Sequence, residues 1–155
     1  MTRKGFEWAL SYAQQLPEFE NVDAARVCLT QEKDEILRQL LVELASLELD
    51  FSPESLKRLE RWYFETGCPE NGVAGYSIPH AIGFYFGEVL CQAGNFQWIV
   101  EENELQGGRF EIGVRRGLGT IMLMRGRKPL LKGNSRMQSL LRECRKFLSI
   151  GKAGT

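Results

Sequence analysis

Apolar residues recur at intervals of three and four through the first 93 positions, which is the spacing of helices that bury one face. The pattern predicts three helices, over residues 3–16, about 30–49 and 52–67. Thr30 is expected to cap the second helix, and Ser52 to cap the third with Pro53 in its first turn. Residues 24–29 fit either an extended segment or a helical turn.

The most apolar helical segment lies at residues 77–94, where we expect a central buried helix. Ser77 suits the position that caps a helix start, and Gly94 suits a helix end. Within the apolar run only Glu88 and Gln92 are strongly polar. A helix that is apolar almost all round is usually buried on all sides.

Beyond Gly94 the apolar spacing changes from that of a helix to that of a strand. Three alternating runs predict three strands, with the apolar residues Phe96, Trp98 and Val100, then Phe110, Ile112 and Val114, then Ile121 and Leu123. Glycines in the connections predict that these strands form an antiparallel meander. A last apolar stripe predicts a closing helix, with Asn134 or Ser135 as its cap.

These elements predict an α+β fold in one domain over residues 1–155. Its parts are expected at about 3–93 for the helices, about 96–124 for the sheet and about 135–149 for the closing helix. A chain of 155 residues is long enough to bury a substantial core.

Composition points to a soluble globular protein, with 43% hydrophobic and 26% charged residues. No long apolar segment follows the basic residues near the N-terminus, so we expect neither a secretory signal nor a membrane anchor. The four cysteines lie far apart and form no C-x-x-C pair, which favours free thiols in the cytoplasm. With a single histidine beside them, we expect no metal site and no cofactor.

The net charge of zero conceals an uneven distribution of charge along the chain. Residues 1–104 carry 8 Lys and Arg against 18 Asp and Glu, whereas residues 105–155 carry 12 against 2. Such a split indicates either a basic surface for nucleic acid or an acidic partner, or two halves that pair their charges with each other. We favour the interpretation that the two halves pair their charges with each other.

The basic residues after position 114 are the best candidates for binding an anion or a partner, and they are Arg115, Arg116, Arg125, Arg127, Lys128, Lys132 and Arg136. Contacts between such a cluster and phosphates would be salt-dependent and weakly specific. Aromatic residues are scarce there, so the cluster lacks the stacking surfaces that single-stranded nucleic acids need.

Glu88 is the most suggestive single residue for acid–base chemistry, because apolar neighbours would disfavour its charge. A structural role is also open, either on a solvent-facing edge beside Gln92 or as an acceptor for the Trp98 indole. His80 invites pairing with Glu88, but eight residues separate their backbones by about 12 Å along a helix. No residue is predicted to be catalytic, and the glycines near the hairpin lack the context of a phosphate loop.

Residues 51–148 resemble small uncharacterised bacterial α+β proteins. The resemblance rests on Gly83, Gly87, Glu88, Val89 and Leu90 in a helix, on Trp98 in the strand that follows, and on the helix start at residues 51–56. It implies a cytoplasmic binding module, of the kind found among immunity proteins, and it brings no catalytic residues with it.

Our leading hypothesis is therefore a small bacterial cytosolic protein that binds another protein without catalysis, as immunity or antitoxin-like proteins do. The first alternative is a nucleic-acid-associated protein that uses the basic C-terminal third. The second is an enzyme centred on Glu88. We expect no membrane partner.

Overall fold

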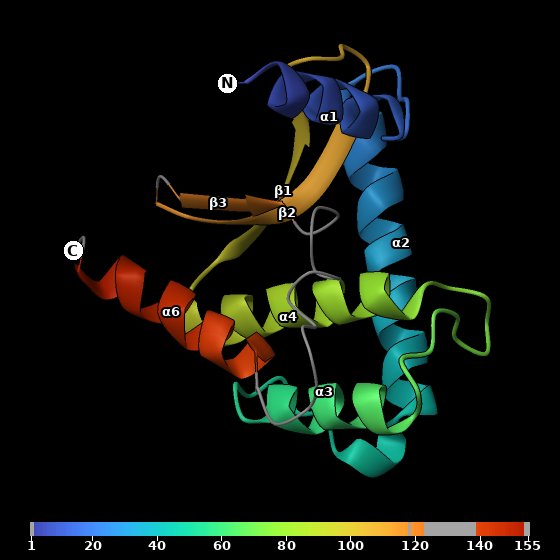
Figure 1. Cartoon of the computed structure of the whole chain (residues 1–155), viewed down its shortest axis with the longest axis vertical. Coiled ribbons are helices and arrows are strands. Elements are labelled where there is room, and N and C mark those ends of the chain that lie inside the picture. Colours follow the sequence, from blue (N-terminus) through green and yellow to red (C-terminus); the bar gives the residue numbers. More distant parts are fainter. Residues whose placement is uncertain (1, 118, 123–138, 154–155) are drawn as a thin grey trace.

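The computed structural model of the chain describes residues 2–117, 119–122 and 139–153 (Figure 1). These residues form five α-helices and an antiparallel sheet, so the protein is of mixed α+β class. The helices are α1 (Arg3–Gln14), α2 (Val22–Glu43), α3 (Ser55–Glu65), α4 (Ile78–Gly94) and α6 (Ser139–Ala153), with a short 3-10 helix, η1, at Ala45–Leu47.

Helix α4 is the buried centre of the fold, as its apolar sequence predicts. The Ser77 hydroxyl accepts a hydrogen bond from the His80 amide at 3.4 Å, and Asn95 ends the helix in the left-handed conformation. Eleven of its 17 residues are buried, and the exposed ones lie in its last turn. Figure 1 shows α4 between the sheet and α3, which explains why the helix has no broad polar face.

Helix α2 begins at Val22, so the prediction that it starts at Thr30 is wrong. The Asn21 side chain accepts a hydrogen bond from the Ala24 amide at 2.9 Å and caps the helix earlier. Ala25 and Leu29 are buried and continue the inward stripe of the helix. The exposed Val27 hides this period in the sequence, because it adds an apolar residue on the solvent side.

The same helix ends at Glu43, and not at about residue 49 as its apolar stripe predicts. The chain continues through η1, and Glu48 and Phe51 then take left-handed backbone conformations, with φ of 52° and 62°. Helix α3 begins at Ser55, so the prediction that Pro53 lies in its first turn is wrong. The Ser52 hydroxyl accepts a hydrogen bond from the Ser55 amide at 3.2 Å, ahead of the helix.

The expected meander of three comparable strands is wrong. The sheet is mainly a two-stranded antiparallel ribbon of β1 (Gln97–Glu102) and β2 (Phe110–Arg116), paired from Gln97 opposite Arg115 to Glu102 opposite Phe110. A short segment, β3 (Gly119–Met122), lies along only the last residues of β2. A tight turn at Gly117, with φ of 58°, starts β3 at Gly119, ahead of the predicted alternating run at residues 121–124.

Helix α6 closes the core against α3 and α4, with Leu140, Leu141 and Cys144 buried in the contact. A closing helix is therefore present as predicted, while its expected caps at residues 134 and 135 lie outside the described residues. The sheet packs against α2 and α4 on the other side of the core.

Candidate functional site

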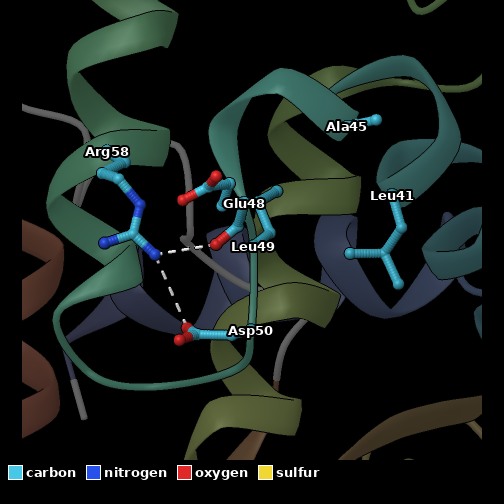
Figure 2. Close-up of a pocket in the computed structure, with 6 residues that line it drawn as sticks. All are labelled: Leu41, Ala45, Glu48, Leu49, Asp50 and Arg58. Carbon is cyan, nitrogen blue, oxygen red and sulfur yellow. Dashed lines mark hydrogen bonds and ion pairs between the residues drawn. The ribbon is translucent and has the colours of Figure 1, made fainter.

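An open depression lies between the C-terminal end of α2 and the chain that leads into α3 (Figure 2). Its volume is about 560 Å³, and it is lined by Leu41, Ala45, Glu48, Leu49, Asp50 and Arg58. The apolar side chains of Leu41 on α2 and Ala45 on η1 lie on one side, and the charged side chains of the connecting chain and of Arg58 on α3 lie on the other. The depression is therefore amphipathic.

Arg58 holds the charged wall in place. Its guanidinium donates hydrogen bonds to the carbonyl oxygens of Leu47 and Glu48, both at 2.8 Å, and lies 3.6 Å from the Asp50 carboxylate. Hydrogen bonds from the Ser52 hydroxyl and amide keep the pKa of Asp50 below its usual value. Asp50 therefore stays anionic at neutral pH, and Arg58 acts as a brace for the backbone.

The backbone of this wall is strained at two places. A left-handed conformation costs a residue other than glycine roughly 1–2 kcal/mol, and both Glu48 and Phe51 adopt it. The Phe51 amide donates to the Tyr85 hydroxyl at 2.9 Å, and the two rings stack with centroids 5.0 Å apart. Strain that neighbouring contacts enforce is typical of ligand clamps and switch regions.

A second depression, of about 310 Å³, adjoins the first and shares Leu41 with it. It is lined by Lys33, Asp34, Leu37, Arg38, Leu41, Phe51 and Glu88. Leu37, Leu41 and Ala45 follow each other at intervals of four, which places them along one side of α2 as it passes into η1. We call the residues that line the two depressions the α2 groove.

Lys33, Glu88 and Trp98 meet at one end of the α2 groove. The Lys33 side chain is buried, with its ammonium 2.9 Å from the Asp34 carboxylate and 4.6 Å from the centre of the Trp98 ring. The Trp98 indole donates to Glu88 at 2.7 Å, and Gln92 donates to the other Glu88 oxygen at 3.2 Å. Glu88 is half-buried, and both of its oxygens accept hydrogen bonds. The contacts among Lys33, Glu88 and Trp98 join α2, α4 and β1.

His80 lies in the first turn of α4, eight residues before Glu88 on the same helix. Its ring packs against Phe84 with centroids 4.4 Å apart, and its Nε2 is buried without a hydrogen-bond partner. Burial lowers the pKa of His80, so the imidazole is neutral at pH 7. The structure places His80 and Glu88 apart, as the helical rise requires.

Two of the seven candidate basic residues, Arg115 and Arg116, lie in the described part of the chain. Arg115 forms an ion pair with Glu101 across the ribbon. Arg116 donates to the carbonyl oxygens of Gly94 at 2.9 Å and Phe147 at 2.6 Å, and thereby ties β2 to α4 and α6. The others, Arg125, Arg127, Lys128, Lys132 and Arg136, lie outside the described residues.

Sequence reasoning missed two buried carboxylates. Glu60, on α3, is 1% exposed and accepts hydrogen bonds from the amides of Ser139 and Leu140, at 2.9 and 3.1 Å, so it caps α6. Glu111, on β2, accepts from the Tyr12 hydroxyl at 2.8 Å and fastens α1 to the sheet. The available signal was the position of Glu60 beside Leu59, on the apolar side of its helix.

The described residues contain neither a group of metal-ligating side chains nor a helix that could span a membrane. In residues 2–117, 119–122 and 139–153 no group of His, Cys, Asp and Glu side chains is arranged to hold a metal ion. Among the helices of this part of the chain, none has the length and apolar character to span a bilayer.

The sequence matches a known protein family. The family described as "Uncharacterised protein YwmA" matches residues 18–148. The chain belongs to this family. The match contains the α2 groove, the Glu88–Trp98 pair and Glu60, and it begins after α1. It extends the resemblance found over residues 51–148 towards the N-terminus. No curated protein and no solved structure matches the chain.

Proposed function

We propose that the chain is a protein-binding module of the bacterial cytosol, that it acts without catalysis, and that the α2 groove is its binding surface. The observation that carries the proposal is the groove itself, in which apolar side chains of α2 and η1 lie beside charged side chains, with the connecting backbone held in place by Arg58. Surfaces that bind proteins combine such apolar area with charged side chains at the edge.

The shape of the α2 groove favours a protein segment over a small molecule. Sites for small molecules are concave and bury most of the ligand surface. Both depressions are open instead, and they adjoin along several turns of one helix. Glu88 already accepts two hydrogen bonds, and Arg58 donates to backbone carbonyls, so these groups hold the scaffold together.

The cysteines support a reducing compartment. Cys28, Cys68, Cys91 and Cys144 are all free. Burial raises the pKa of Cys91 to about 12 and that of Cys144 to about 11, which keeps both thiols protonated and unreactive. Within this function, an immunity or antitoxin-like role, in which a small domain binds and blocks another protein, is the form that the resemblance favours.

A paired pull-down from the natural host tests the proposal. The immobilised baits are the wild type, Ala45→Arg in the α2 groove, and Val42→Arg as the matched control, since Val42 is 68% exposed and does not line the groove. We expect one protein in stoichiometric amount on the wild type and on Val42→Arg, and none on Ala45→Arg. No retained protein, or equal retention by Ala45→Arg, would contradict the proposal.

A further inference from the structure

The α2 groove has the length and charge to hold one particular kind of segment, and we infer that it binds the apolar face of a basic amphipathic helix that belongs to another protein. The inference rests on the proposed function and specifies the partner.

The apolar wall has the dimensions of a helix-binding surface. Leu37, Leu41 and Ala45 lie at intervals of four along α2 and η1, and Lys33 extends the line by one more turn. Twelve residues span about 18 Å at helical rise. A helix laid in a groove presents anchors at about three- and four-residue intervals, so three or four anchors would fit this length.

Apolar surface remains available for such anchors. Leu41 and Leu49 are partly buried hydrophobic residues packed on the core, and their remaining surface faces the first depression. Phe51, also partly buried, lines the second depression with its ring stacked on Tyr85. Anchors from a partner would therefore extend the core of this protein across the groove.

The rim of the groove is acidic, with Asp34, Glu48, Asp50 and Glu88 against Lys33, Arg38 and Arg58. Two of the acidic side chains are partners of these cations, since Lys33 pairs with Asp34 and Arg58 lies 3.6 Å from Asp50. Arg38 pairs with Glu35, beside the rim, so Glu48 and Glu88 carry the excess of negative charge.

Residues 1–104, which supply every residue of the groove, carry the same sign of charge, with 18 acidic side chains against 8 basic ones. A segment rich in Lys and Arg would be attracted to this rim, whereas an acidic segment or a nucleic acid would be repelled. Charge complementarity therefore assigns basic residues to the flanks of the partner helix.

Helix α6 of a second copy is not available to occupy the groove. This basic amphipathic helix exposes Arg142, Arg145 and Lys146. Its apolar residues Leu140, Leu141 and Cys144 are already buried against the rest of the chain. Binding α6 in the groove of another copy would require this contact to open, which favours a helix from a different protein.

Designed peptides test the inference with the full-length chain. The probes are fluorescent helices of about 14 residues with leucines at i, i+4, i+7 and i+11, flanked by lysines in one peptide and by glutamates in the other. A scrambled Leu–Lys peptide is the third probe. By fluorescence anisotropy we expect the Leu–Lys helix to bind at least about tenfold more tightly than either of the others.

Variants locate the binding. Ala45→Arg is expected to weaken the Leu–Lys helix at least about tenfold, and Val42→Arg to leave its affinity unchanged. Glu48→Lys is the second groove variant. It should reduce or reverse the difference in affinity between the Leu–Lys and Leu–Glu helices. Ala45, Val42 and Glu48 are all exposed, so the variants should melt within a few degrees of the wild type, and a thermal melt checks this.

Each other result overturns a defined part of the inference. Equal binding of the Leu–Lys and Leu–Glu helices overturns the basic partner, and binding that Ala45→Arg leaves intact overturns the location. If no peptide binds while the pull-down still yields an Ala45-dependent protein, the helical occupant is wrong and the proposed function stands. A dimer in sedimentation velocity that Ala45→Arg dissociates would assign the groove to a second copy.

Discussion

Individual side chains join segments that are far apart in the sequence, and Glu60 is the clearest example. One carboxylate on α3 caps the start of α6, 79 residues later. The hypothesis that Glu88 accepts a hydrogen bond from the Trp98 indole came from the sequence, because the two residues flank a helix end and a strand start. The sequence did not indicate the partners of Glu60, which are two backbone amides and the Ser139 hydroxyl at the start of α6.

Replacing Glu60 with Gln should destabilise the protein by about 2 kcal/mol, because the amide leaves a single oxygen for the buried donors of α6. Glu65→Gln is the matched control on the exposed side of the same helix, with an effect expected within about 0.5 kcal/mol. Urea unfolding measures both. Equal stability of the two variants would show that Glu60 does not hold α6.

His80 should make the stability depend on pH in the acidic range. The folded protein disfavours protonated His80, whereas the unfolded chain takes up the proton below about pH 6.5. Stability is therefore complete above that pH and falls as the pH drops below it. The His80→Phe variant keeps a ring against Phe84 and should lack this dependence of stability on pH. Parallel curves of stability against pH for the variant and the wild type would contradict the assignment to His80.

The helices could be predicted from the sequence better than their ends or the sheet. Helices α1, α3 and α4 follow their apolar periods closely, since each buries one or more faces in the core. The start of α2 was missed because the exposed Val27 blurs the period. The ribbon of β1 and β2 follows from clear alternation, whereas the extent of β3 depends on the turn at Gly117.

The corrected start of α2 can be checked by a pair of substitutions. Asn21→Ala should cost about 1 kcal/mol, because it removes the acceptor for the Ala24 amide. Thr30→Ala should cost little, since residue 30 lies within the helix and alanine is the better helix former. The midpoints of denaturant unfolding compare the two variants. A larger loss of stability for Thr30→Ala than for Asn21→Ala would favour a helix start at Thr30.

Charges that are separated in the sequence pair with each other in the folded molecule. Ion pairs between the acidic residues before 105 and the basic residues after it join Arg109 to Glu18, Arg115 to Glu101 and Arg145 to Glu54. Pairs this exposed contribute about 0–1 kcal/mol each, so they orient the parts more than they stabilise them.

The α2 groove could not be predicted from the sequence, because Leu37, Leu41 and Phe51 look like ordinary core residues there.

The most direct test of the α2 groove as a protein-binding surface is site-specific photocrosslinking in living host cells. A photoreactive phenylalanine is placed at Ala45 inside the groove or at Val42 on the adjacent exposed face. The account predicts one crosslinked protein from position 45, attached through a basic amphipathic segment, and none from position 42. No adduct at position 45, or the same adduct from both positions, would contradict it.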